Sequence, residues 1–153
     1  LHSGDKAPLN FPTQKDKWTL YAICKNAVLQ SSPTSGVWYN LGNLRLSVPK
    51  GVWEASYKTT VYIGNIGAGI GIYTTLSNSS STDSDDRFTL ESETPGGTSQ
   101  ATSYPHTIPT DTIRNSAMTP YYLNTKHTGG GTSNIYNFGG RTTTKVAFVN
   151  GYL

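Results

Sequence analysis

The sequence contains very little sulfur, with Cys24 and Met118 as its only cysteine and methionine among 153 residues. A single cysteine cannot form an internal disulfide, and it leaves no Cys/His set of the kind that binds zinc. Cys24 ends the apolar segment 18–24, where a small buried hydrophobic side chain is expected. A bridge-free domain of this composition is typical of folding in a reducing cytosol, even for a protein that later works outside a cell.

Charged residues are also sparse, at 14% of the chain against about 25% in average soluble domains. The net charge is +3 and the isoelectric point about 9.0, yet the basic residues are scattered along the chain. Only Lys15 and Lys17 come close together, and Asp16 lies between them. Nucleic-acid binding requires a concentrated basic face, so we do not expect a nucleic-acid partner.

Long apolar runs are missing as well. The sequence has no stretch of 18 apolar residues and no charged-then-apolar start, so we expect neither a membrane span nor a signal peptide. A start at Leu1 rather than Met indicates a processed or excised fragment. Residues 1–17 hold two prolines and no periodic pattern, which predicts an N-terminal linker or arm. A single domain then covers residues 18–153, a length suited to one core.

Alternating polar and apolar side chains dominate the remaining sequence. Ser, Thr, Gly and Asn replace the charged residues, and ten tyrosines outnumber four phenylalanines, which favours strands and turns over helices. Apolar and polar residues alternate over 44–48 and, most clearly, over 53–63. In the second segment Trp53, Ala55 and Tyr57 begin one apolar face that continues to Ile63. Both segments are predicted strands with one buried face.

Weaker alternation predicts further strands over 66–74, 87–93, 121–127, 133–138 and 143–153. Polar stretches over 77–86 and 94–103 predict loops. Pro105, Pro109 and Pro120 exclude a central strand or a regular helix between 104 and 120. About eight strands with one apolar face each predict an all-β, antiparallel two-sheet sandwich. A jelly roll is the leading topology and an immunoglobulin-like sandwich the second.

No catalytic constellation emerges from the sequence. The Gly-x-Ser-x-Gly turn of many serine hydrolases is absent. The only histidines are His2, His106 and His127, and none stands in a pattern typical of a nucleophile and its base. Glu91 and Glu93 share one face of a predicted strand, about 6 to 7 Å apart, but any two residues at this spacing on a strand lie so. We therefore expect a protein that is not an enzyme and needs no cofactor.

One acidic cluster raises the question of a metal. Asp83, Asp85 and Asp86 lie together in the polar stretch 77–86, and carboxylates are ligands for Ca²⁺. The spacing lacks the glycine and the distal glutamate of an EF-hand loop. A solvated loop without metal is the prediction.

A recognition surface remains as the source of function. Aromatic side chains in loops or on polar strand faces are candidates for contact with a polar ligand such as a sugar, because Tyr supplies rigid contact area while Ser, Gly and Asn adapt. The candidates are Trp38, Tyr39, Tyr104, His106, Tyr122 and Tyr136. Gly67, Gly69 and Gly71 occupy one face of the predicted strand 66–74. They would permit close approach of another backbone or subunit, and plain solvent exposure is the alternative.

Two parts of the sequence carry a family resemblance. The stretch LRLSVPKGVWEASY, residues 44–57, resembles the strand, Pro-x-Gly-x-Trp turn and long strand that open C-terminal head domains of tailed-bacteriophage tail fibres and tailspikes. The end is similar too, with Tyr121-Tyr-Leu, a Gly-rich turn, Ile135-Tyr-Asn-Phe-Gly and a last strand. The resemblance covers about residues 40–153. It implies a homotrimer of jelly-roll-like domains at the tip of a virion tail fibre, assembled in the bacterial cytoplasm.

Such a head would bind a host receptor, often lipopolysaccharide or capsule glycan and otherwise another outer-membrane receptor, or would drive trimer assembly without a ligand of its own. The resemblance offers no catalytic residues, because depolymerase activity in these proteins belongs to a separate upstream β-helix. Two other classes stay open: a glycan-active enzyme domain, and a cellular signalling or lectin-like jelly roll. The lack of disulfides argues against the last.

Overall fold

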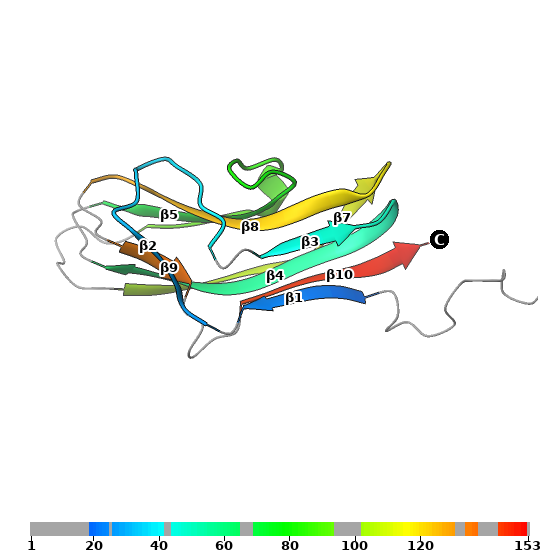
Figure 1. Ribbon diagram of the computed structural model, residues 1–153, viewed down its shortest axis with the longest axis horizontal. Helices are drawn as coiled ribbons and strands as arrows, with labels where there is room; N and C mark the ends of the chain where they lie inside the picture. Colours follow the sequence, from blue (N-terminus) through cyan, green and yellow to red (C-terminus); the bar gives the residue numbers. More distant parts are fainter. Residues whose placement is uncertain are drawn as a thin grey trace, which may run out of the picture.

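The computed structural model describes residues 19–24, 26–41, 44–64, 69–93, 102–130, 134–137 and 144–152 (Figure 1). These ranges hold ten strands and one 3-10 turn at Asp86–Phe88, and no helix in them is long and apolar enough to cross a membrane. The strands are β1 (Thr19–Cys24), β2 (Val28–Ser31), β3 (Arg45–Val48), β4 (Gly51–Gly64), β5 (Gly71–Ser77), β6 (Thr89–Glu93), β7 (Thr102–Asn115), β8 (Thr119–Thr128), β9 (Asn134–Asn137) and β10 (Thr144–Tyr152). The predicted linker 1–17 lies outside the described residues.

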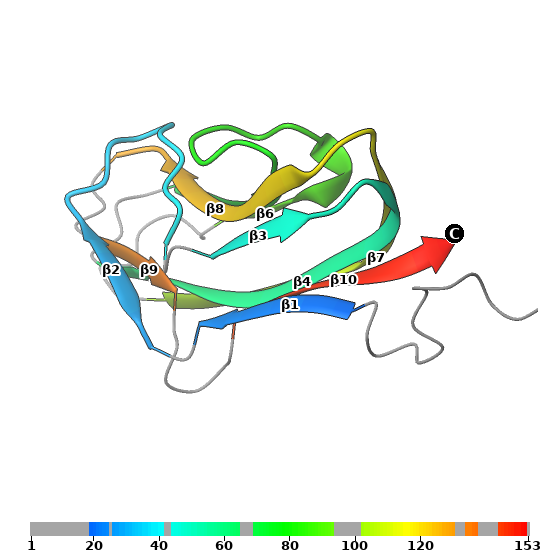
Figure 2. The same ribbon diagram turned by 45° about the vertical axis from the view of Figure 1, so that its right-hand side comes forward.

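The strands form two antiparallel sheets packed face to face. The larger sheet has the order β1-β10-β4-β9-β2, with β7 also paired to β4, and the smaller has the order β3-β8-β5-β6. Without β2 and β9, the orders β1-β10-β4-β7 and β3-β8-β5-β6 are those of a jelly roll. The all-β, two-sheet prediction is therefore confirmed, and Figure 2 shows the two layers from a second side.

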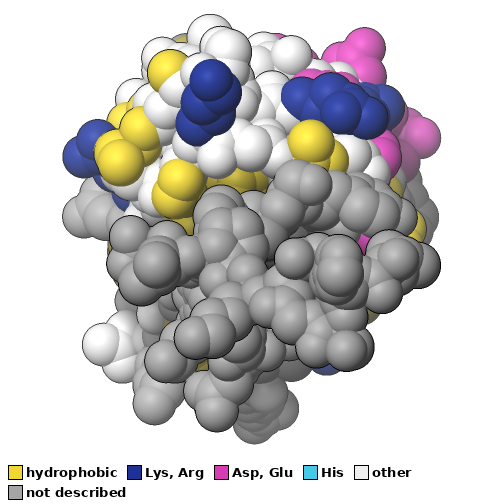
Figure 3. Space-filling model, turned by 90° about the vertical axis from the view of Figure 1, so that its right-hand side faces the viewer, with side chains coloured by type: hydrophobic (Ala, Val, Ile, Leu, Met, Phe, Trp, Pro, Cys, Tyr) yellow, Lys and Arg dark blue, Asp and Glu magenta, His cyan; other side chains and the backbone are white. Residues whose placement is uncertain are grey.

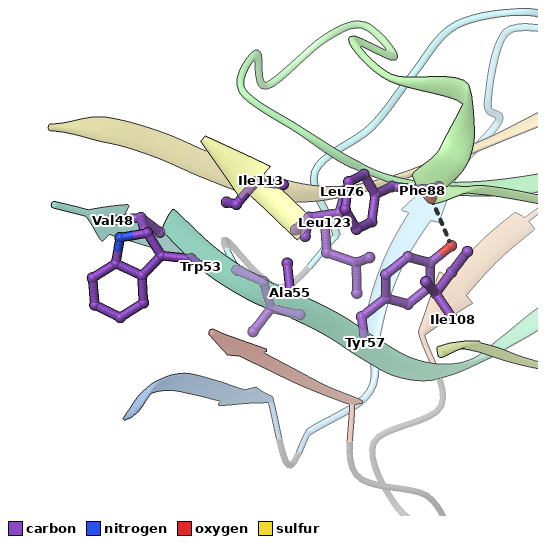
Figure 4. Packing of buried hydrophobic residues seen from close by; sticks show 10 residues of the cluster. Val48, Trp53, Ala55, Tyr57, Leu76, Phe88, Ile108, Ile113 and Leu123 are labelled. Carbon is purple, nitrogen blue, oxygen red and sulfur yellow. Dashed lines mark hydrogen bonds between the residues drawn. The ribbon is translucent and has the colours of Figure 1, made fainter. Parts of the chain in front are cut away.

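The alternation that predicted strand 53–63 is present in β4. Trp53, Ala55 and Tyr57 are at most 3% exposed, while Glu54 and Lys58 on the other face are exposed to solvent. Figure 4 shows Ala55 and Tyr57 pointing toward Leu123 of β8 on the opposite sheet. Every second residue from Trp53 to Ile63 is buried, so this long strand contributes a full row of the core, and Thr60 on the other face is buried as well.

The interior is divided into two clusters of buried hydrophobic residues. The larger contains Leu44, Val48, Trp53, Ala55, Tyr57, Leu76, Phe88, Ile108, Ile113 and Leu123. The smaller contains Leu41, Val61, Ile63, Ile70, Ile72 and Ile135. Cys24 is half-buried and packs against the larger cluster. Cys24 thus packs as a small hydrophobic side chain, as predicted, but it is half-buried rather than buried.

The long strand β7 is the main element that the sequence analysis missed. It pairs with β4 along its length, and β4 is its only partner strand in the described part of the chain. An edge position explains how the strand accommodates prolines, because one side of it donates no ladder hydrogen bonds. Pro109 falls at a register shift opposite β4, and Pro120 is the second residue of β8. The exclusion of a central strand at 104–120 holds for β7, but the weak alternation hid an edge strand.

Two other strands begin later than predicted. In place of a strand over 66–74, β5 starts at Gly71; Gly69 precedes it with a φ of +66°, and Gly67 lies outside the described residues. The segment 87–93 opens with the 3-10 turn, and β6 starts at Thr89. A left-handed residue cannot continue a strand, which places the boundary after Gly69.

Candidate binding surface

Three side chains on neighbouring strands form a row across the outer side of the smaller sheet. Lys126 of β8 is paired with Tyr73 of β5, and Tyr73 is paired with Glu91 of β6. The neighbours of Tyr73, Ile72 and Thr74, are fully buried and point inward. Directly opposite residues share a face, so all three members of the row point outward.

Trp38 extends this row beyond β8. The segment 32–41 runs beside β8, where Tyr39 and Thr125 exchange backbone hydrogen bonds of 2.9 and 2.8 Å. Trp38 therefore lies next to Lys126, whose Nζ is 4.3 Å from the centre of the Trp38 ring and 4.8 Å from that of Tyr73. The ammonium group is held between two aromatic rings by cation–π attraction. We call Trp38, Tyr73, Glu91 and Lys126 the Lys126 cluster.

A hydrogen bond and a glycine fix the position of Tyr73. Its hydroxyl donates to Oε1 of Glu91, and this bond raises the pKa of Tyr73 because it stabilises the protonated phenol. The ring lies against Gly71, where an added Cβ would stand 3.0 Å from Cε2 of Tyr73 and 2.7 Å from Oγ1 of Thr128. The absence of a side chain at Gly71 leaves room for the ring to lie against the sheet.

The predicted polar loop over 77–86 folds back over the same sheet. Asn124 of β8 donates from Nδ2 to the carbonyl oxygens of Ser79, at 2.7 Å, and Thr82, at 2.9 Å. Asn124 is fully buried beneath this loop, although it points outward from the sheet. Figure 2 shows this loop and the segment 32–41 both rising above the smaller sheet. The Lys126 cluster thus stands on paired strands of the smaller sheet, and the loop 77–86 and the segment 32–41 lie on the same side of that sheet.

Two predicted contact residues lie on this outer side. Trp38 belongs to the cluster, although its ring is only 8% exposed. Tyr122 points outward from β8 four residues before Lys126, and the guanidinium carbon of Arg45 lies 5.9 Å from the centre of its ring. Asn124 and its covering loop lie between Tyr122 and Lys126. The structure therefore brings Trp38, but not Tyr122, into the cluster.

Tyr39 and Tyr104 do not reach this surface. Tyr39 and Tyr104 are half-buried and pack against the smaller hydrophobic cluster, and the Tyr39 hydroxyl accepts a 2.9 Å hydrogen bond from the backbone of Thr34. Tyr104 lies in β7 rather than in a loop. The side chain of Tyr136 lies outside the described residues. Tyr39 and Tyr104 contribute to packing more than to an open face.

His106 lies inside the sandwich, which corrects its predicted place among exposed contact residues. It is 2% exposed; Nδ1 lies 2.7 Å from Oγ1 of Thr74, and Nε2 lies 2.8 Å from Oγ of Ser92. Oγ1 of Thr74 is in turn 3.0 Å from the buried hydroxyl of Tyr57. We call Tyr57, Thr74, His106 and Ser92 the His106 chain. Burial lowers the pKa of His106, since the charged imidazolium loses its hydration between the sheets.

The Ser92–His106 contact resembles half of a hydrolytic triad. A triad places a carboxylate behind the histidine, which orients the ring and stabilises its positive charge. Here the neutral hydroxyl of Thr74 occupies that place. With the imidazole 2% exposed, this arrangement stabilises the interior and presents no base to solvent.

Asp85 and Glu91 have local structural partners. Asp85 caps the 3-10 turn through Arg87 N and forms an ion pair with the Arg87 guanidinium at 2.7 Å, which lowers the pKa of Asp85. Glu91 is bonded to Tyr73. In the described ranges, no group of three or more His, Cys, Asp or Glu side chains is arranged to hold a metal ion.

The glycines predicted for subunit contact have separate environments. Gly69 is exposed in a left-handed turn, and Gly71 is buried under Tyr73 and Thr128 of its own chain. Tyr73 and Lys126 were missed because neither stands out locally in the sequence, and Glu91 was considered only as a carboxylate pair with Glu93. Only the register of three strands, which have separate positions in the chain, brings them together.

No protein-family model matches the chain, and no curated protein matches its sequence.

Proposed function

We propose that this domain is the receptor-binding head of a bacteriophage tail fibre, which holds a bacterial surface glycan by contact and without catalysis. The Lys126 cluster is the observation that carries the proposal. It combines the half-buried Tyr73 ring, an ammonium group and a carboxylate on one outward face, and the ammonium also lies over the ring of the buried Trp38. A binding site for a polar ligand needs this mixture, because apolar area supplies affinity while a few placed polar groups set the orientation.

The rigidity of the cluster supports a role in binding. Tyr73, Glu91 and Lys126 stand on paired strands, so their backbones are fixed by the sheet. Sites on strands are more precise than sites on loops, and a side chain that is already ordered loses less entropy when a ligand binds. The Lys126 ammonium has three N–H donors and can offer one to a sugar hydroxyl or an acidic group.

The fold and the resemblance support the proposal at a coarser level. Jelly rolls are common among viral and lectin domains, although a fold alone does not assign a function. The resemblance to fibre heads adds the setting: a homotrimer at the tip of the virion tail fibre, with lipopolysaccharide or capsule glycan of the host as receptor.

Adsorption to bacteria tests the proposal. Labelled protein is incubated with whole cells, with and without extracted lipopolysaccharide or capsule polysaccharide as competitor. Lys126→Gln is expected to lower adsorption at least tenfold. Lys58→Gln is the matched control, because Lys58 is exposed on the larger sheet and its replacement changes the charge equally.

Three outcomes would contradict the proposal. Equal adsorption of the two lysine variants would remove the Lys126 cluster as the site. Absence of competition by either polysaccharide would remove the glycan as ligand. Release of reducing sugar from the polysaccharide would replace the binding function by an enzymatic one.

A second candidate is a trimerisation module without its own ligand. Tyr21 and Ile23 alternate with inward-packing residues of β1 and are 60% and 40% exposed, and Leu29 of β2 is 57% exposed. Large apolar side chains at such exposure on one sheet favour contact with another subunit. Light scattering should then give three times the chain mass of 16.5 kDa, and Tyr21→Ser should shift the mass toward the monomer. A wild-type monomer at assay concentration excludes this candidate.

A further inference from the structure

A polar pocket lies at one edge of the sandwich, apart from the Lys126 cluster. It has a volume of about 440 Å³ and is lined by Asp85, Arg87, Thr112, Ile113, Arg114 and Tyr121. These residues come from the 3-10 turn and the residue before it, from the end of β7 and from the start of β8. Pockets that hold small molecules are roughly 300 to 1,000 Å³, so this one suits a ligand at the small end of that range.

One side of the pocket is held rigid by ion pairs. Arg87 donates from Nε and Nη2 to the two carboxylate oxygens of Asp85 at 3.1 and 2.7 Å. Its Nη1 lies 3.4 Å from Asp111 and 3.3 Å from the carbonyl oxygen of Thr112. A bidentate pair of this kind fixes the plane of the guanidinium group. Arg87 is therefore part of the wall, and its charge is balanced by neighbouring carboxylates.

Arg114 differs from Arg87 in having no such partner. It is exposed and lines the pocket, and its guanidinium group makes no ion pair or hydrogen bond with any residue in the described ranges. A planar group with five N–H donors matches carboxylate or phosphate oxygens in a fork-like geometry. Arg114 is thus the group in the pocket that is open to an anion.

The other wall groups select for hydroxyls. The Asp85 oxygens accept three hydrogen bonds, all from Arg87. A carboxylate has about four acceptor positions, which leaves one for a ligand hydroxyl. Thr112 adds a side-chain hydroxyl to the lining. Asp85 and Asp111 both pair with Arg87, so Arg114 is the cation of this lining that no carboxylate of the described ranges pairs with, and a ligand hydroxyl on Asp85 would add a second contact beside it.

We infer that this pocket binds an acidic monosaccharide unit, with its carboxylate on Arg114 and a ring hydroxyl on Asp85. Figure 3 shows the end of the molecule where the chain turns from β7 to β8; Lys and Arg side chains lie directly beside Asp and Glu side chains at one edge. The inference does not rest on the proposed function, since it concerns a different surface and a ligand that the isolated chain can bind in solution.

Titration of the full chain with sodium glucuronate, followed by amide NMR, tests the inference. We expect concentration-dependent shifts of the backbone amides of residues 112–114. Glucose is the neutral arm and inorganic phosphate the anion without a sugar ring. Glucuronate should bind at least tenfold more tightly than either.

Variants of the exposed arginines locate the site. Arg114→Gln should weaken glucuronate binding tenfold or more, and Arg114→Lys should weaken it less, because the charge stays while the fork is lost. Arg45→Gln is the matched control, since Arg45 is exposed on the smaller sheet near Tyr122 and its replacement removes the same charge. Circular dichroism checks that each variant is folded.

Any of four results would overturn the inference. Phosphate binding equal to or tighter than glucuronate would make the pocket a plain anion site. Equal binding of glucose would remove the role of Arg114. Equal losses in the Arg114→Gln and Arg45→Gln variants would show an effect of net charge, and absence of shifts at 112–114 would place any binding elsewhere. Failure of adsorption to bacteria leaves all these measurements unaffected.

Discussion

The His106 chain and the Lys126 cluster use similar side chains on opposite sides of the smaller sheet. Inside, the hydroxyl of Tyr57 and the ring of His106 meet at Thr74, and both aromatic residues are 2% exposed. Outside, the hydroxyl of Tyr73 donates a hydrogen bond to the exposed Glu91. The ammonium of Lys126 lies 4.8 Å from the centre of the Tyr73 ring. Tyr73 and Thr74 are sequence neighbours, so one step along β5 separates the two constellations.

The two groups differ in whether water can take the place of a hydrogen-bond partner that a substitution removes. A buried hydrogen bond is expensive to remove, because the partner left behind loses hydration and gains nothing. At the surface water takes over, so that the same change costs little stability and can alter only binding. The comparison predicts that changes inside affect unfolding and changes outside affect adsorption.

Removing the core ring beside the His106 chain should have the largest effect. Phe88 is 1% exposed, and its carbonyl oxygen lies 3.1 Å from the Tyr57 hydroxyl (Figure 4). We expect Phe88→Ala to lower the free energy of unfolding by about 3 to 5 kcal/mol through lost burial and the cavity left behind. Urea unfolding measures it. Met118→Ala, at a site 70% exposed, should change the value by about 0.5 kcal/mol at most, and similar losses in both would refute the assigned core.

A pair of tyrosine variants compares the two sides directly. Tyr57→Phe deletes a hydroxyl that lies 2.9 Å from the carbonyl oxygen of Thr74 inside the core, and it should cost about 1 to 3 kcal/mol because buried acceptors lose their partner. Tyr73→Phe deletes the hydroxyl bonded to Glu91 outside, and it should cost about 0.5 kcal/mol or less. Urea unfolding at pH 7.5 gives both numbers. Equal losses of unfolding free energy would mean that a hydroxyl in the core and a hydroxyl on the outer face contribute alike to stability.

Acidification should lower the free energy of unfolding through His106. Its pKa in the folded protein lies below the ordinary value of 6.5 because of burial, so on acidification the unfolded chain takes up a proton before the folded one does. The stability that the neutral ring provides is therefore present above pH 6.5 and is lost as the pH falls below that value. The unfolding free energy, measured from pH 8 to 5, should fall more steeply for wild type than for His106→Gln. Parallel curves would show that His106 does not carry this dependence.

The sequence predicted the strands whose side chains alternate strictly, and the missed features depend on pairing between distant segments. β4 was predicted because Trp53, Ala55 and Tyr57 repeat every second residue, which only a strand with one buried face requires. β7 was missed because prolines rarely fit a strand, and its edge position beside β4 is set by the whole sheet.

For the same reason, the sequence could predict only part of the candidate site. Trp38 was named as a candidate contact aromatic and lies in the Lys126 cluster, although it is buried, and its partners Tyr73 and Lys126 follow from strand register. His106 was placed among contact residues because it lies beside the candidate Tyr104 in a proline-broken segment. The hydroxyls of Thr74 and Ser92 that satisfy its ring come from two other strands, β5 and β6, so the sequence around it could not indicate burial.

Gly71 offers the finest test of the comparison, because a methyl group there disturbs the outer side alone. The new Cβ would stand 2.7 Å from Oγ1 of Thr128 and 3.0 Å from the Tyr73 ring. Both neighbours are side chains that can turn away, so Gly71→Ala should cost only about 1 kcal/mol in urea unfolding while it displaces Tyr73 and lowers adsorption. Gly130→Ala, where nothing lies within 4 Å, should change neither quantity.

A Tyr73→Ala background shows whether the ring is responsible for the Gly71→Ala cost. Contacting residues are not additive, so the cost of the glycine change should fall once the ring is gone. An unchanged cost would place the strain on Thr128 instead. Adsorption that survives Gly71→Ala would mean that the exact position of Tyr73 does not matter for binding. The fixed geometry of the Lys126 cluster would then not be needed for recognition of the ligand.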